Sequence, residues 1–136
     1  MLKSKEILKD AKTIAVIGAS NNPIKSAYRI PKYLQDAGYN VIPINPNSEN
    51  VLGVKTYKSI SDIPQEIKID IVDIFRPSKD IENLMPAIIE RFKKLNDIKL
   101  VWLQEGIHSQ KAKELCKDNN IEFIQGICIY KVHASI

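Results

Sequence analysis

The sequence has 136 residues, of which 44% are hydrophobic and 26% charged, a composition ordinary for one compact domain with a sizeable core. The net charge of +4 suits an anionic ligand, but nucleic acid is disfavoured because the lysines are scattered and only three Phe and one Trp are available for stacking. Two cysteines, Cys116 and Cys128, do not make a disulfide framework, which favours a reducing compartment. No signal-peptide core and no stretch near the ~20 apolar residues of a membrane span is seen, so we expect a cytoplasmic protein with no membrane partner.

The chain begins with a short amphipathic helix suggested by Ile7, Leu8 and Ala11, which we expect to cover one edge or end of the core. The apolar run at 14–17 then predicts a strand buried on both faces. It is followed by a small-residue turn and by a helix from about Tyr28, whose first turn accommodates Pro31. Gly38 fits the position just after this helix.

The second strand is predicted at 40–45, with Pro43 limiting its hydrogen bonding on one side. From 46 to 68 the periodicity fades, leaving a short extended piece at 54–57 and a possible helical turn at 59–63. Residues 69–75 form the third major strand, and we expect Asp70 and Asp73 near its start or at a less buried edge.

Ser78 is expected to cap the next helix, which Pro86 should kink or restart. A strand at 99–103, a helix capped by Ser109 and a strand at 121–124 follow, whereas the tail from 125 to 136 has no strong pattern. Alternating strands and helices indicate a single α/β domain over residues 1–136, a doubly wound, Rossmann-like fold with a mostly parallel five-stranded sheet and helices on both faces.

Ligands of such folds bind outside the carboxyl ends of the strands. We therefore expect the residues that follow each strand to converge on one crevice: Gly18-Ala19-Ser20, Asn45-Pro46-Asn47, Phe75-Arg76-Pro77-Ser78, Gln104-Glu105-Gly106 and Gln125 to Cys128. Countercharge for an anion would come from Lys25, Arg29, Arg76 and Lys79.

A nicotinamide dinucleotide is the obvious ligand to consider, and two features count against it. Only Gly18 remains of the Gly-x-Gly-x-x-Gly fingerprint, and Asn45 stands where dinucleotide sites place an acidic residue for the ribose hydroxyls. An NAD(P)-linked oxidoreductase stays an alternative.

Several motifs then carry a family resemblance over nearly the whole chain. They are IAVIGASNNPIKSAYRIPKYLQDAGYNVIPINPNSENVLGVKTYKSISDIP, VDIFRPS, VWLQEGI, and Cys128 followed five residues later by His133. The sequence resembles the small stand-alone CoA-binding domain proteins, which share their fold with the CoA-binding N-terminal domain of succinyl-CoA synthetase alpha subunits. The sequence departs from that family at Ile127, Tyr130 and Val132, where polar residues are common, and at Pro31.

The resemblance implies coenzyme A or an acyl-CoA as ligand. Gly18, Ala19 and Ser20, with Lys25, Tyr28 and Arg29, would hold the phosphates, and Asn45 and Pro46 would lie beside the nucleotide. Phe75, Arg76 and Pro77 would flank the adenine or the pantetheine arm, and Gln104, Glu105 and Gly106 would approach the pantetheine.

No catalytic constellation is found. His108 and His133 have no nucleophile at motif spacing, and Glu105 is a lone carboxylate. Cys116 fits a buried helix face, whereas Cys128 could face the crevice and form a mixed disulfide with the CoA thiol under oxidation.

We therefore expect a CoA-binding sensor or carrier module that is not an enzyme. The alternatives are the oxidoreductase above and the CoA-binding subunit of a split acyl-CoA synthetase, which would need a partner subunit. A homodimer is also possible.

Overall fold

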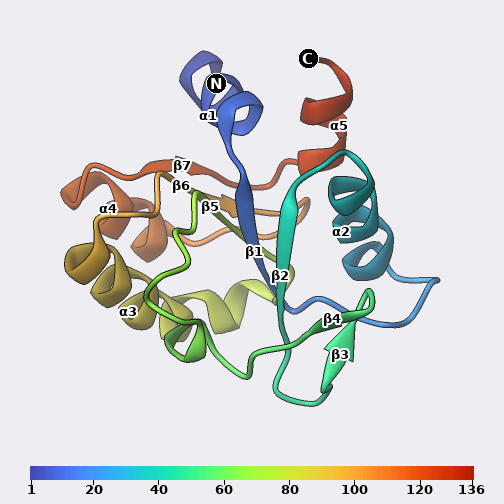
Figure 1. The fold of residues 1–136 in the computed structure, drawn as a ribbon. Coiled ribbons are helices and arrows are strands. Elements are labelled where there is room, and N and C mark those ends of the chain that lie inside the picture. Colours follow the sequence, from blue (N-terminus) through green and yellow to red (C-terminus); the bar gives the residue numbers. More distant parts are fainter.

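The computed structural model describes residues 1–136 and is built on a five-stranded parallel sheet (Figure 1). Its strands are β1 (Thr13–Ile17), β2 (Asn40–Ile44), β5 (Ile71–Ile74), β6 (Leu100–Leu103) and β7 (Glu122–Ile124), in the order β2-β1-β5-β6-β7. Strand β1 therefore pairs with β2 on one side and β5 on the other. The chain adds β2 on one side of β1 and then β5, β6 and β7 on the other side. The gap between β1 and β5 is therefore the topological switch point of a doubly wound fold.

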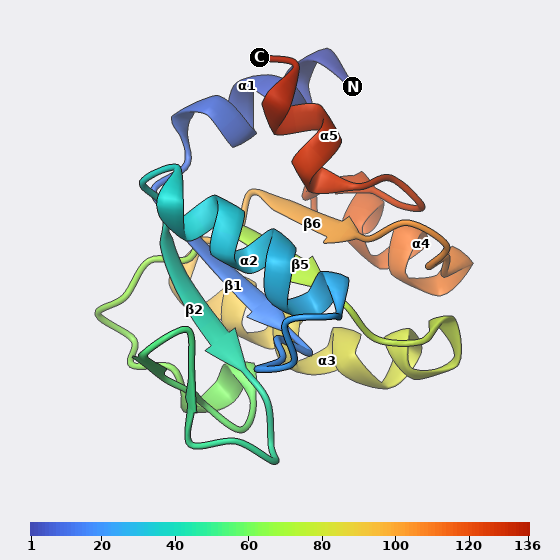
Figure 2. The same ribbon diagram turned by 90° about the vertical axis from the view of Figure 1, so that its right-hand side faces the viewer.

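Helices cover both faces of this sheet. The helices α1 (Leu2–Asp10), α2 (Ser26–Asp36) and α5 (Ile129–Ala134) lie over one face, and α3 (Ser78–Leu95) and α4 (Gln110–Asp118) lie over the other, with the short 3₁₀ helix η1 (Ile60–Asp62) beside α3 (Figures 1 and 2). None of these helices is long and apolar enough to cross a bilayer. The predicted fold class is confirmed.

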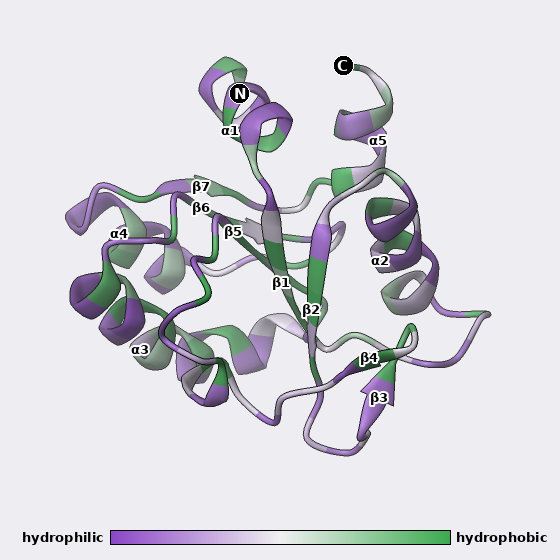
Figure 3. Cartoon of the chain, in the orientation of Figure 1, coloured by the Kyte–Doolittle hydropathy of each residue, from purple (hydrophilic) through white to green (hydrophobic).

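Two apolar clusters, one on each face of the sheet, form the core. Alternate residues of one strand belong to different clusters: Val16 packs toward α2 and α5, whereas Ile17 packs toward α3. Most residues of the strands are apolar, apart from polar residues such as Asn40 at the start of β2 and Glu122 at the start of β7, while the outer helix faces are hydrophilic (Figure 3). A strand buried on both faces needs a continuous apolar run, and the sequence supplies one for β1 and for β6.

The sequence pattern predicted an extended piece at 54–57 but not its pairing into a hairpin, and it did not predict the last helix. A small antiparallel hairpin, β3 (Asn50–Val51) and β4 (Val54–Lys55), turns through Leu52 and Gly53, both at positive φ (58° and 71°). Helix α5 lies in the tail from 125 to 136. This tail showed no sequence pattern because the six residues of α5 contribute only Ile129 and Val132 to the core. Two buried positions are too few for a periodic signal.

Two local expectations at helix α3 were wrong. Ser78 is the first residue of α3 and not its cap; its hydroxyl accepts from the His108 amide at 3.0 Å. Pro86 does not restart this helix, which is continuous from Ser78 to Leu95 with the proline on its exposed side, so the restart is wrong and the kink stays a prediction.

Pro31 occupies a different place from the one expected. Helix α2 begins at Ser26, so Pro31 lies beyond the first turn. Because Pro31 has no N–H, the Ala27 carbonyl one turn earlier has no helical donor and accepts instead from the Ser20 amide at 3.1 Å. The proline thus leaves an acceptor free to hold the β1–α2 loop.

Asp73 was expected at a less buried position, and this is also wrong. Asp70 does lie at the start of the strand, where its carboxylate accepts from the amides of Lys12 and Thr13 (2.9 and 3.0 Å). Asp73 lies in the middle of β5, opposite Val16 and Trp102, and is fully buried. The sequence does not show that a polar residue within an apolar strand is buried, because its hydrogen-bond partner comes from the end of another strand.

Candidate functional site

Gly18 allows β1 and β5 to end side by side at the switch point. It has φ +87°, and a Cβ built on it would lie 2.5 Å from the Phe75 carbonyl oxygen. Its amide donates to the Ile44 carbonyl at 2.9 Å, which links the ends of β1 and β2. Glycine is therefore required here by the close approach of the protein's own backbone.

The free backbone amides of this region lie at the start of α2. The amides of Gly18 and Ser20 donate to carbonyl groups of the protein, whereas those of Ser26 and Ala27 are in the first helical turn and have no partner. The Ala19 amide is also unpartnered. Free donors at the N-terminus of a helix favour an anion.

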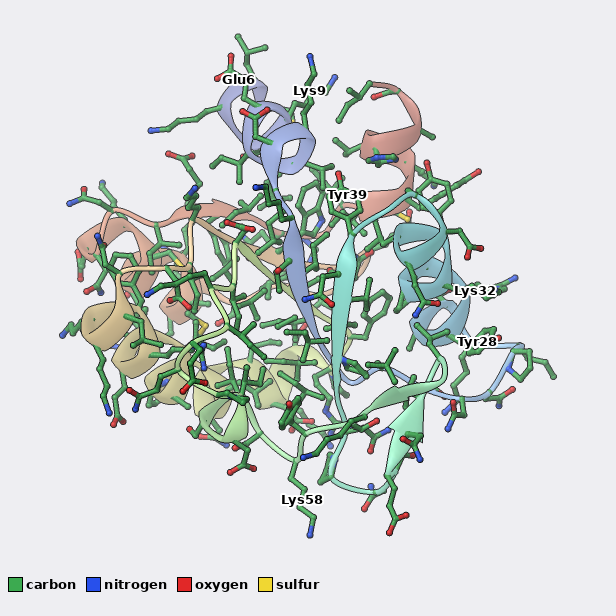
Figure 4. The ribbon with its side chains drawn as sticks, viewed as in Figure 1. Glu6, Lys9, Tyr28, Lys32, Tyr39 and Lys58 are labelled. Atoms are coloured by element: carbon green, nitrogen blue, oxygen red, sulfur yellow. The ribbon has the colours of Figure 1, made fainter.

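A cavity of about 800 Å³, here called the wide cavity, is lined by Ala27 and by residues at the ends of β1, β2 and β5. Lys25 and Lys58 line it, and neither forms an ion pair. Figure 4 shows the Lys58 side chain extending from the segment that follows β4. Arg76 also lines the wide cavity, but its guanidinium pairs with Asp80 at 2.7 Å. Two uncompensated ammonium groups and the free amide of Ala27 make this cavity suitable for phosphate.

Asn45 joins the loops that border the wide cavity. Its Nδ2 donates to the Ala19 carbonyl at 2.8 Å, and its Oδ1 accepts from the Asn47 amide at 2.8 Å. The side chain thus holds the β1 loop against the end of β2 and turns the chain after β2.

A second cavity of about 360 Å³, here called the narrow cavity, adjoins the wide one. The two share Ala27, Phe75 and Arg76 in their linings. The narrow cavity extends past Gln104 to Cys128, which is only 7% exposed. The remaining lining residues are Ser26, Ile30, Pro77, Glu105 and Ile107.

Most of the residues proposed from the sequence line one of these cavities. Those in the wide cavity are Gly18, Ser20, Lys25, Asn45, Pro46, Phe75 and Arg76, and those in the narrow cavity are Phe75, Arg76, Pro77, Gln104, Glu105 and Cys128. Ala19, Tyr28, Arg29 and Gly106 line neither, and nor does Lys79.

Lys58 and Ser59 are lining residues that the sequence did not indicate. They reach the site because Tyr57 pairs with the end of β2: its amide donates to Pro43 at 3.1 Å and its carbonyl accepts from Asn45 at 2.9 Å. A one-residue bridge of this kind has no periodic signature. Ser26 and Ala27 were also missed, because the helix was expected to begin two residues later.

Asp73 is the titratable group near the site whose pKa is most changed. Complete burial raises its pKa from 3.8 to about 7, and the hydrogen bond from Gln104 opposes that rise. The Gln104 Nε2 donates to Asp73 Oδ1 at 2.5 Å, whereas Asp73 Oδ2 has no partner.

The histidines and the other cysteine lie outside both cavities. His133 Nδ1 hydrogen-bonds the Tyr33 hydroxyl at 2.7 Å, joining α5 to α2. Cys116 is buried in α4, and burial raises the pKa of its thiol to about 12, so it is the buried apolar residue expected.

The chain matches the family described as "CoA binding domain" over residues 12–134. It is 37% identical to the Bacillus subtilis protein YneT over 130 residues, which cover 96% of this chain and 91% of YneT. A solved structure of a hypothetical protein from Pyrococcus horikoshii superposes with a TM-score of 0.89 at 33% identity, covering 98% of this chain and 89% of that one.

A longer relative shares part of the chain. The alpha subunit of the ADP-forming acetate–CoA ligase II of Pyrococcus furiosus is 42% identical over 73 residues. These cover 53% of this chain but only 16% of that subunit.

Proposed function

We propose that this chain, which belongs to the CoA-binding domain family, binds coenzyme A or an acyl-CoA in the wide and narrow cavities. The observation that carries this proposal is the pairing of a lysine-bearing wide cavity with a narrow cavity that adjoins it at Ala27. Coenzyme A has the same division, because a bulky phosphorylated nucleotide continues into a thin pantetheine arm.

In this arrangement the phosphates take the ammonium groups of Lys25 and Lys58 in the wide cavity and the unpartnered amide of Ala27, where the two cavities meet. The pantetheine arm lies in the narrow cavity with its thiol toward Cys128. Asn45 acts by fixing the β1 loop and not by accepting from a ribose, since both ends of its amide bind the protein backbone.

We propose a sensor or carrier role without catalysis. The carboxylate lining the narrow cavity, Glu105, is exposed and pairs with Lys131 at 3.4 Å, and the histidines lie outside both cavities. A thioester could be held here, but a base is not placed to activate a nucleophile against it.

The match to a ligase alpha subunit favours a second candidate, the CoA-binding part of a split acyl-CoA synthetase. In that role the chain alone would bind coenzyme A but form no thioester from acetate, coenzyme A and ATP. Activity would appear only when the remaining ligase domains are supplied.

Thermal-shift titration with coenzyme A, NAD⁺, NADP⁺ and ATP tests the proposal. Coenzyme A at about 100 times its Kd should stabilise the protein by about 2.7 kcal/mol, and NAD⁺ should have little effect. Lys58→Ala and Lys25→Ala should weaken the response, whereas Lys113→Ala, an exposed lysine of α4, should not. Equal stabilisation by NAD⁺, or none by coenzyme A, would refute the assignment.

The proximity of Cys128 to the proposed thiol position has its own test. On incubation with CoA disulfide, the Cys128 thiolate would attack one sulfur, form a mixed disulfide and release one CoA thiolate. Intact-mass measurement should show one added CoA at Cys128, and the absence of this adduct would place the thiol elsewhere.

A further inference from the structure

The buried carboxyl group of Asp73 is one end of a hydrogen-bonded chain that reaches the narrow cavity. Asp73 Oδ1 accepts from Gln104 Nε2 at 2.5 Å, and Gln104 Oε1 accepts from the Ile129 amide at 3.3 Å. Ile129 is the first residue of α5, and Cys128 is its N-cap residue. Gln104 therefore connects the middle of the sheet to the backbone that carries Cys128.

Asp73 also decides which way the Gln104 amide is turned. A carboxylate oxygen accepts, so it selects the NH₂ end of Gln104 and leaves the carbonyl end for the Ile129 amide. In the opposite orientation two donors would meet at Ile129. Gln104 is 4% exposed, so water would not compensate for that loss.

We propose that Asp73 is a positioning residue for the narrow cavity, acting through Gln104 to hold the first turn of α5 and with it the Cys128 side chain. The part of this inference that concerns the pantetheine arm rests on the proposed function. The effect on Cys128 does not depend on any ligand.

The surroundings of Asp73 make this chain sensitive to pH. Its strand neighbours Val16 and Trp102 carry no charge. The titratable groups of α1, α2 and α5 that are at least half-buried are Lys5, Tyr28, Tyr33 and His133, together with Cys128, the N-cap residue of α5. Tyr33 and His133 are bonded to each other, and Tyr130 is exposed. The ionic side chains of α2 and α5 are exposed. Burial is thus the main cause of the raised pKa of Asp73, about 7.

A ligand that fills the narrow cavity replaces the water inside that cavity, next to Gln104, with less polar atoms. The region around Asp73 then stabilises a charge less well, which disfavours the ionised form. Coenzyme A should consequently bind more weakly as the pH rises above 7. Asp73→Asn keeps an acceptor for Gln104 but cannot ionise, so its affinity relative to the parent should increase with pH.

The test uses Gln104→Met, Asp73→Asn and a matched control, Gln125→Met. Gln125 also follows a strand at this edge and accepts a hydrogen bond from a backbone amide, that of the α4 N-cap residue Ser109 at 2.9 Å, but it lines neither cavity. Calorimetric titration is done with coenzyme A and with adenosine 3′,5′-bisphosphate, which lacks the pantetheine arm. The alkylation rate of Cys128 is measured by mass spectrometry without ligand.

Gln104→Met should lose about tenfold in affinity for coenzyme A, because the first turn of α5 and the Cys128 wall of the narrow cavity are no longer held in place. The affinity for the bisphosphate should change little. Gln104→Met should also alkylate faster at Cys128, whereas Gln125→Met should match the parent in both measurements. Equal losses for the two ligands, or an unchanged alkylation rate, would overturn the proposal. If neither ligand binds the parent, the proposed function fails while the alkylation rates still decide the positioning role. If Gln104→Met does not fold, Asp73→Asn decides the proposal. Its affinity for coenzyme A is then compared with that of the parent across pH, or its Cys128 alkylation rate if coenzyme A does not bind. Parallel pH profiles of the two proteins would overturn the positioning role of Asp73.

Discussion

Replacing Asp73 by Asn should make the stability of this protein less dependent on pH. The pKa of Asp73 is raised by burial to about 7, against an ordinary value of 3.8. Between these two values the folded protein holds a proton that the unfolded chain has released. The contribution of Asp73 to folding stability is therefore largest below pH 3.8, falls as the pH rises through this window, and levels off above pH 7.

The magnitude follows from the width of the window. Each pH unit inside it costs about 1.4 kcal/mol, so the parent should lose about 3 kcal/mol between pH 5 and pH 8 relative to Asp73→Asn. The full burial of Asp73 leaves no solvent to screen the charge. With an m-value of about 2 kcal/mol per molar urea, the difference between the two midpoints should change by about 1.5 M.

Urea unfolding of both proteins at pH 5 and pH 8 measures this change. Asp36→Asn, which alters an exposed carboxylate of α2 paired with Lys32, is the control and should differ from the parent by the same amount at both pH values. A constant difference between Asp73→Asn and the parent would show that the Asp73 carboxyl group does not titrate in this window, and the reasoning from burial would be wrong.

Three further predictions concern the backbone at Gly18, the buried ion pair and the two thiols. In the urea assay, Gly18→Ala should destabilise the fold by about 3 kcal/mol, because of the positive φ and the contact with Phe75. Gly53→Ala, also at positive φ but facing open space, should cost about 1 kcal/mol. Arg91→Met should cost about 3–5 kcal/mol in chemical denaturation, because it leaves the buried Asp97 carboxylate without its partner at 3.1 Å; a loss under 1 kcal/mol would contradict this. Iodoacetamide should label Cys128 in the native protein and Cys116 only after unfolding, because burial raises the pKa of Cys116 to about 12. Peptide mapping that shows Cys116 labelled in the native protein would refute this prediction.

Much of the candidate site could be read from the chain because parallel strands end at the same edge of the sheet. Once 14–17 and 69–75 were recognised as strands, the residues after them had to meet, and Gly18 and Phe75 do so at the switch point. The residues that could not be read reach the site through single contacts. Lys58 arrives through the Tyr57 bridge to β2.

The roles of individual atoms were hidden for a related reason. Whether a backbone amide is free depends on which carbonyl lies opposite it. The Ser20 amide, for example, is bonded because Pro31 has no N–H to donate to the Ala27 carbonyl, which accepts from Ser20 instead. The same is true of Asn45, whose amide is used on both sides by neighbouring loops. No spacing in the sequence encodes such pairings.

The sequence by itself determined the alternation of strands and helices, and with it the doubly wound sheet, because burial on both faces demands apolar runs of strand length separated by amphipathic helices. Only the tertiary structure decided the environment of Asp73 and the division of the crevice into wide and narrow cavities. Both depend on side chains that approach from strands and helices distant in the chain, and the distances between them are set by packing and not by residue order.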